Sequence, residues 1–94
     1  MPTYVMLSNL TDEGSKTIKH RPERIKEVNA ELEALGVKVV AQWATLGPYD
    51  FVNIVEAPDN LAIARVSAEL ASRGTLRLTS LPAIDIDALI AALK

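Results

Sequence analysis

The stretch VKVVAQWATLGPYDFVNIVEA, residues 37 to 57, decides the fold. Residues 37–46 and 51–57 are two runs of β-branched and apolar residues, which is typical of strands. Only Gly47-Pro48-Tyr49-Asp50 separates them, and Gly, Pro and Asp are favoured in turns. Because two strands with so short a connection must pair antiparallel, the sequence predicts a β-hairpin near the middle of the chain.

Helical patterns flank this hairpin on both sides. On the N-terminal side, Thr11 is expected to cap one helix, and Pro22 restarts a second over 22–35. Its apolar residues recur every three or four positions, and Gly36 ends it. On the C-terminal side, a helix is expected to begin at Pro58-Asp59 and to close at Gly74.

The two ends of the chain add two strands and one more helix. TYVMLSN, residues 3–9, and TLRLTSL, residues 75–81, have the composition of strands, and 85–94 has the pattern of a terminal helix. The resulting order is βαββαβ followed by a helix, which predicts an α+β, ferredoxin-like fold in a single domain, residues 1–94. We expect a four-stranded antiparallel sheet with two helices on one face and strands 3–9 and 51–57 in its middle.

Composition narrows the classes of function. The chain has 94 residues, no cysteine and a net charge of −2. We expect neither a nucleic-acid partner nor a membrane partner, because the charge is not basic and no long apolar run exists. The absence of cysteine, and of any signal-peptide pattern at the N-terminus, leads us to expect a cytoplasmic protein. We expect no cofactor, and no metal site, since His20 is the only histidine.

Helices on one face leave the other face of the sheet uncovered, and this face is our main functional clue. We expect Val5, Leu7, Leu76 and Leu78 to face the helices, and Tyr4, Met6, Ser8, Thr75, Arg77 and Thr79 to lie on the uncovered face. Strand 37–46 is apolar on both sides, which sheet-on-sheet packing requires, so Trp43 fits either face. The sequence therefore predicts a homodimer whose sheets face each other, with a small organic ligand between them. The ligand-binding candidates are Tyr4, Ser8, Trp43, Asn53, Arg77 and Thr79.

Two segments of the chain resemble the GYD-domain family. The residues that carry the resemblance are Thr11, Gly14 and Lys16, and then Gly47, Tyr49, Asp50, Glu56, Ala57, Pro58 and Asp59. The resemblance implies a dimeric α/β-barrel assembly but no particular reaction. Proteins of this fold include enzymes and ligand-sensing regulatory domains, so the fold alone does not select among them.

Tyr49 and Asp50 are the candidate catalytic pair. A phenol beside a carboxylate can serve in acid–base chemistry if burial raises the pKa of the carboxyl group. The alternative is structural, because Asp side chains commonly bond the backbone of a turn. Both interpretations remain open at the level of the sequence.

Lys16, His20 and Arg21 form a candidate anion-binding patch, because this part of the chain is rich in cations. Glu23 and Glu27 lie within helical reach, so an internally paired, solvated face is the alternative.

Two functions follow from the whole sequence. The first is a homo-oligomer that binds a small molecule, with or without cofactor-free catalysis. The second is a non-catalytic regulatory or assembly module.

Overall fold

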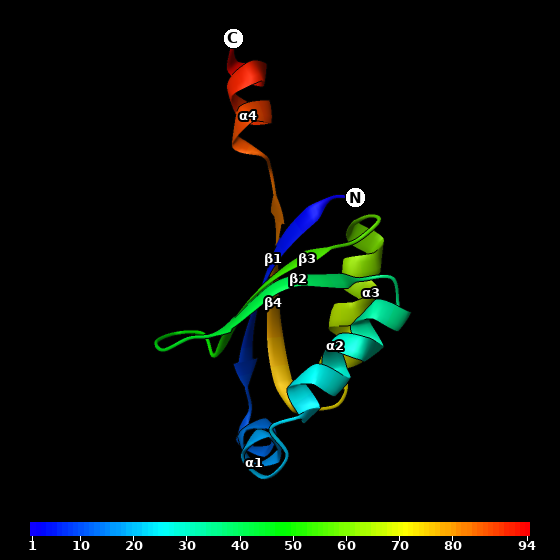
Figure 1. Cartoon of the computed structure of the whole chain (residues 1–94), viewed down its shortest axis with the longest axis vertical. Helices are drawn as coiled ribbons and strands as arrows, with labels where there is room; N and C mark the ends of the chain where they lie inside the picture. The colour runs from blue at the N-terminus through cyan, green and yellow to red at the C-terminus, as the bar shows by residue number, and fades with distance from the viewer.

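The computed structural model describes all 94 residues, as four strands and four helices (Figure 1). The sheet has the order β2-β3-β1-β4 with every neighbouring pair antiparallel, as expected for a ferredoxin-like fold. Helices α2 and α3 lie against one face of it (Figure 1). The bounds are β1 Thr3–Leu10, α1 Asp12–His20, α2 Arg24–Ala34, β2 Lys38–Ala44, β3 Phe51–Glu56, α3 Asn60–Ala71, β4 Leu76–Ala83 and α4 Ile86–Leu93.

Local capping chemistry sets the helix boundaries. The side chains of Thr11, Asp59 and Asp85 each accept a hydrogen bond from a backbone N–H in the first turn of α1, α3 and α4. Gly36 and Gly74 follow α2 and α3 with φ of 87° and 73°, a conformation that glycine adopts without strain. The helix starts and stops predicted from the sequence are therefore confirmed to within a few residues.

The hydrophobic core lies between the sheet and helices α2 and α3. Val55 and Val66 are fully buried in it, and Leu32 comes from the apolar stripe of α2. Leu76 and Leu78 pack against this core as predicted.

The predicted faces of β1 were wrong. Tyr4 and Met6 are 2% and 1% exposed on the helix side, and Ser8 is buried beside them, whereas Val5 and Leu7 lie on the uncovered face. The cause is that β1 is apolar on both sides, so its hydrophobic pattern carries no phase. The polarity of Ser8 favoured the outer face in the prediction, although this residue is buried.

Helix α4 extends away from the rest of the molecule. It continues from the end of β4 and points beyond the sheet, so that it does not cross the uncovered face (Figure 1). The chain measures 51 Å along its longest axis, and its radius of gyration of 14.3 Å exceeds the ~12.4 Å typical of a compact domain of this length. None of the four helices, of which α3 is the longest with 12 residues, has the length and hydrophobicity to cross a bilayer.

Candidate functional site

The uncovered face of the sheet is an apolar surface built by all four strands. Residues paired directly across antiparallel strands share a face, so the register assigns its rows. One row runs across the sheet through Trp43, Val52, Leu7 and Thr79, and the next through Ala41, Ile54, Val5 and Leu81. We call these eight residues the open face. Their side chains are exposed or half-buried.

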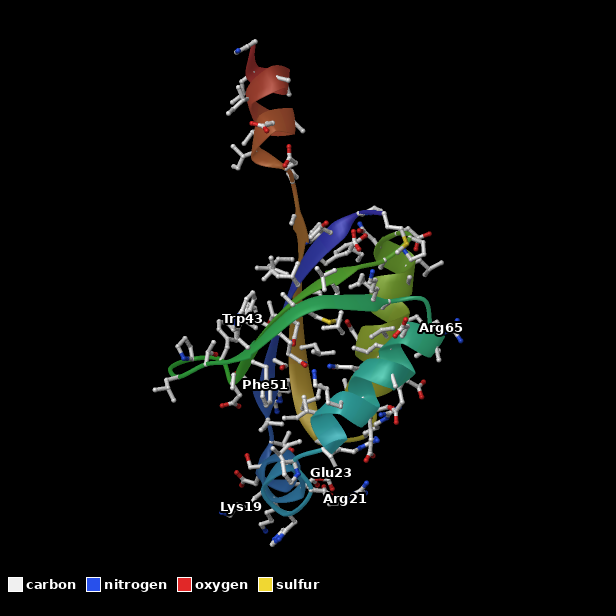
Figure 2. All side chains as sticks on the ribbon, viewed as in Figure 1. Lys19, Arg21, Glu23, Trp43, Phe51 and Arg65 are labelled. Atoms are coloured by element: carbon white, nitrogen blue, oxygen red, sulfur yellow. The ribbon has the colours of Figure 1, made fainter.

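Trp43 lies at one edge of the open face and is 56% exposed. Figure 2 shows its indole ring on the side of the sheet away from α2 and α3. A bulge in β2 between Val39 and Ala41 resets the alternation of that strand and turns Gln42 to the helix side and Trp43 outward. The sequence left the orientation of Trp43 open, and the structure resolves it.

The six predicted ligand-binding residues are divided between the two sides of the sheet. Thr79 belongs to the open face with Trp43, and Arg77 lies next to that face on the same side of β4. Tyr4, Ser8 and Asn53 are buried on the helix side instead. The hydroxyl group of Tyr4 donates a 2.7 Å hydrogen bond to Asn60 Oδ1, which satisfies it within the core. The six residues therefore do not form one cluster.

Helix α4 presents a second apolar surface. Ile86 and Leu93 are 64% and 79% exposed, and Leu89 and Ile90 are also exposed. The sequence predicted this helix and its apolar pattern, but nothing in that pattern showed that it would find no partner in its own chain. Val5 and Leu7 of the open face were also missed, because the phase of β1 was wrong. Val52 and Ile54 were not identified because the phase of β3 was left open, and Leu81 was not singled out although the phase of β4 was correct.

The chain matches a family model and is similar to known proteins. The family model described as GYD domain matches residues 4–93, nearly the whole chain. This chain belongs to the GYD-domain family. A protein of Thermus thermophilus named "Glutamine synthetase and cystathionine beta-lyase binding protein" is 58% identical over 95 aligned residues, which cover all of both proteins. A crystal structure of a protein from Thermus thermophilus matches with a TM-score of 0.56 and 23% identity, over 90% of this chain and 95% of that one, which supports the fold.

The turn that gives the GYD family its name ties the hairpin to β1 in this chain. Asp50 Oδ2 accepts a 2.8 Å hydrogen bond from the backbone N–H of Leu10, and the backbone N–H of Asp50 donates to the carbonyl of Ser8 at 2.9 Å. On the hairpin itself, Thr45 Oγ1 donates to the carbonyl of Tyr49 at 2.6 Å. Each of these three hydrogen bonds has a backbone group as its donor or its acceptor. This geometry supports the structural interpretation of the Tyr49–Asp50 pair.

Gly14, another residue of the family resemblance, marks a close approach of two backbones. A Cβ atom at this position would lie 1.8 Å from the carbonyl oxygen of Thr75, so no larger residue fits unless α1 moves. Thr11 holds the same junction, because its hydroxyl donates to the carbonyl of Gly74 at 2.8 Å. The GYD residues Thr11 and Gly14 thus fix α1 against the start of β4.

The candidate anion patch is partly neutralised by carboxylates. Arg21 pairs with Glu27 at 2.8 Å and approaches Glu23 at 3.7 Å. Lys16 and His20 are exposed on α1. The geometry of Arg21 agrees with the paired, solvated alternative. No group of three or more His, Cys, Asp or Glu side chains is placed to hold a metal ion.

One cluster of charges connects the two covering helices. Glu31 on α2 pairs with Arg24 at 3.0 Å and with Arg73 just beyond α3. The hydrogen bond from Arg73, followed by that from Arg24, lowers the pKa of Glu31 against the opposing effect of its partial burial. The same carboxylate raises the pKa of Arg24. This cluster ties α2 to the residues just beyond α3 and takes no part in the open face.

Proposed function

We propose that this chain is a non-catalytic protein-interaction module that works as a homodimer. The observation that carries the proposal is the open face: seven of its eight residues are apolar, and the nearest charged residues on the same side of β4 and β3, Arg77 and Glu56, flank it at opposite ends. Catalysis by acid–base chemistry needs such groups aimed at one point. An apolar surface is instead what protein interfaces bury at their centres.

The exposed area of the chain supports pairing. The chain exposes 6299 Å², whereas a compact monomer of 10.2 kDa exposes about 5300 Å². The excess of about 1000 Å² is similar to the ~800 Å² that each partner buries in a standard protein interface. One protein partner of ordinary size therefore accounts for the surface that this chain leaves uncovered.

The occupant of the open face in this proposal is a second copy of the chain. Contiguous apolar surfaces of this kind drive aggregation when they stay exposed. A second copy is present whenever the chain is made, whereas any other partner depends on its own synthesis. Two sheets also pack well face to face, about 10 Å apart, with interdigitating side chains.

The second copy also explains helix α4. An isolated helix of eight residues is not stable in water, because nucleation outweighs so few hydrogen bonds. Helix α4 therefore needs a surface on which to bury Ile86, Leu89 and Ile90. Since α4 extends past the edge of its own sheet, we place it against the body of the second copy (Figure 1).

The dimer is proposed to bind metabolic enzymes. The support is the relative from Thermus thermophilus, which is 58% identical over its full length and whose name states binding to glutamine synthetase and cystathionine β-lyase. We propose the same two enzymes as partners of this chain, with the complex located in the cytoplasm. The enzymes bind the outer surfaces of the dimer, because the open faces are buried between its two copies.

The test is biolayer interferometry with purified glutamine synthetase and cystathionine β-lyase of the same organism. The wild-type chain is expected to bind at least one enzyme with a Kd of micromolar or below, the range of about −8 kcal/mol. Trp43→Ser is expected to weaken binding about tenfold or more by separating the dimer, and Leu46→Ser is the control, since Leu46 is fully exposed at the hairpin tip. If the wild-type chain bound neither enzyme at a concentration about a hundred times the expected Kd, these partners would be rejected.

A second candidate is a small organic ligand held between the two facing sheets. Arg77 favours it, because this exposed cation belongs to none of the five ion pairs of the chain and lies on the same side of the sheet as Trp43 and Thr79. An anionic ligand would fit this arrangement. Native mass spectrometry of protein purified from its source tests it, and a dimer mass without any bound small molecule argues against it.

A further inference from the structure

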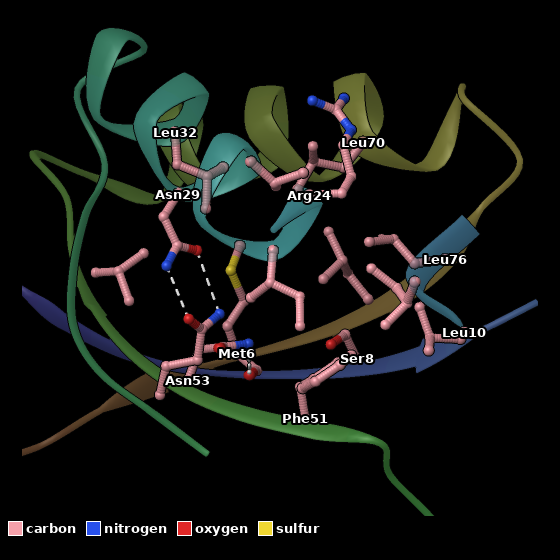
Figure 3. Close-up of a pocket in the computed structure, with 16 residues that line it drawn as sticks. Met6, Ser8, Leu10, Arg24, Asn29, Leu32, Phe51, Asn53, Leu70 and Leu76 are labelled. Atoms are coloured by element: carbon pink, nitrogen blue, oxygen red, sulfur yellow. Dashed lines mark hydrogen bonds between the residues drawn. The ribbon is translucent and has the colours of Figure 1, made fainter. Parts of the chain in front are cut away.

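A cavity on the helix side of the sheet is separate from the open face. It has a volume of about 70 Å³ and lies between the sheet and α2 (Figure 3). Sixteen residues line it, and 11 of them are hydrophobic, among them Met6, Phe51 and Leu76. This cavity takes no part in the function proposed above, so either proposal stands if the other fails.

Asn53 supplies the feature that points to a ligand. Its side chain is 8% exposed, in the middle of β3, and its Nδ2 donates a 3.1 Å hydrogen bond to the carbonyl of Met6. Its Oδ1 is buried with no hydrogen-bond partner. A buried carbonyl oxygen without a donor costs free energy, so such an atom calls for a group that donates to it.

Ser8 adds a second polar group to the same wall. It is 5% exposed and lines the cavity, two residues along β1 from Met6, which pairs directly with Asn53. Figure 3 shows Ser8 and Asn53 on neighbouring strands under α2. Diagonal neighbours of this kind lie about 7–8 Å apart, so one small molecule can reach both.

The remaining polar groups of the cavity are already engaged. Asn29 and Gln42 bond each other reciprocally, at 2.7 and 3.2 Å, and join α2 to the edge strand β2 (Figure 3). The guanidinium group of Arg24 is held by Glu27 at 3.2 Å and Glu31 at 3.0 Å. The cavity therefore offers no free charge, and a charged ligand would lack a counter-ion.

The volume and the polarity of the cavity decide whether water or an organic molecule fits it better. The cavity has room for about five waters, each of which needs two to four polar partners. Asn53 Oδ1 and the Ser8 hydroxyl satisfy one or two waters, and the apolar walls satisfy none. An apolar molecule with one donor group fills the same space with fewer lost hydrogen bonds.

A path to the surface is also present. A neighbouring hollow of about 220 Å³ shares Leu10, Ile18 and Leu76 with the cavity. It reaches Thr17 and Arg73 at the outer end of the helix layer. A small molecule can therefore enter between α1 and α3 without opening the sheet.

We propose that this cavity binds a small neutral molecule with an apolar body and one O–H or N–H donor. The donor bonds Asn53 Oδ1, the Ser8 hydroxyl lies alongside, and the body packs against Met6 and Phe51. Small alcohols, phenols and amides of about five to eight non-hydrogen atoms form this class, by the size of the cavity. The site lies within one chain and needs no second copy.

The test compares phenol with toluene, which has the same size and shape but no donor. Each is titrated into the full-length ¹⁵N-labelled protein, and ¹H–¹⁵N spectra are followed to saturation. We expect phenol to shift the Asn53 side-chain amide and the backbone amides of Met6 and Ser8, and to bind about tenfold more tightly than toluene, the effect of one hydrogen bond.

Variants test whether Asn53 is responsible for the preference for phenol over toluene. Asn53→Leu keeps a side chain of similar size without the oxygen, and is expected to remove the preference for phenol. If Asn53→Leu does not fold, Ser8→Ala is expected to reduce the preference. Thr79→Val, on the opposite side of the sheet, is expected to leave it unchanged.

Three results would overturn the proposal. The first is the absence of saturable shifts with either probe, which would mean that water alone fills the cavity. The second is an unchanged preference for phenol in Asn53→Leu, or in Ser8→Ala where that variant stands in. The third is a set of shifts confined to the open face, for example at Leu7 and Val52.

Discussion

At the scale of single residues, Asp50 illustrates how a polar side chain in a turn can organise a sheet. Its carboxylate reaches across to the N–H of Leu10, the last residue of β1, while its own backbone N–H bonds Ser8. The hairpin β2–β3 is thereby fixed to the central strand just where the strands end. Since Asp50 is engaged by backbone groups, its role in this structure is to position strands.

Two substitutions of Asp50 test this positioning role. Asp50→Ala is expected to lower the free energy of unfolding by about 1–2 kcal/mol, because the N–H of Leu10 loses its acceptor. Asp50→Asn retains an acceptor oxygen and should lose less than half of that amount. Urea unfolding at one fixed protein concentration measures both. Equal losses in the two variants would show that the negative charge, and not the hydrogen bond, matters.

The buried polar residues explain what the sequence failed to predict. Ser8 was expected on the uncovered face with Tyr4 and the face of Asn53 was left open, yet all three are buried on the helix side. In β1 the alternation Tyr4-Val5-Met6-Leu7 is apolar on both faces, so hydrophobicity alone does not fix the phase. The faces of β1 were therefore assigned from its polar residue, although this residue is buried. A sequence does not show which atoms would surround a polar side chain in the folded chain, so its burial could not be predicted.

At the scale of elements, Glu31 links the two helices that cover the sheet. It accepts from Arg24 on its own helix and from Arg73 beyond the end of α3. All three side chains are partly exposed, so solvent screens their attraction and the link is modest. It nevertheless holds α2 and α3 at the end of the helix layer where the cavity opens.

This link should give stability a specific dependence on pH. At pH 7, Glu31→Gln is expected to be less stable than the wild type by about 0.5–1 kcal/mol. Because the folded state lowers the pKa of Glu31 from its ordinary value of 4.5, this contribution is present above that value. It is lost as the pH falls through the depressed pKa of the folded state. The difference between the two proteins should therefore shrink as the pH falls below 4.5.

Urea titrations at several pH values check this expectation, with Glu33→Gln as the control. Glu33 lies on the same helix, is exposed and belongs to none of the ion pairs. Its replacement should change stability little at any pH. A difference for Glu31→Gln that stays constant as the pH falls from 7 to well below 4.5 would contradict the assigned role.

Element boundaries were predictable because their signals are local. Thr11, Asp59 and Asp85 cap helices within three residues of themselves, and Gly36 and Gly74 end them with positive φ. The order of strands also followed from connection lengths. The placement of α4 did not follow, since no local signal tells where a terminal helix finds its partner. The β2 bulge, which sets the orientation of Trp43, was likewise invisible in the pattern.

At the scale of the whole molecule, the open face and α4 are two apolar surfaces that one chain leaves uncovered. The chain has 12 buried residues out of 94, and most of them lie in the single layer between the sheet and the helices. A chain of this size has a marginal core. Pairing across the open face would add a second apolar layer and double the number of buried sheet faces. Stability and association are therefore expected to rise together with protein concentration.

Sedimentation velocity over a range of concentrations tests the pairing with two variants. Trp43→Ser removes the largest side chain of the open face, and truncating an aromatic residue that an interface buries commonly costs about 2 kcal/mol or more, so the dimer Kd should rise about 30-fold or more. Leu89→Asp places a charge on the apolar side of α4 and should weaken the dimer as well, because a buried carboxylate without a partner is costly. Leu46→Ser, at the exposed hairpin tip, should change nothing. A wild-type chain that sediments as a monomer at about 100 µM, well above the Kd expected for an interface of this size, would reject the pairing of open faces and the role of α4 together.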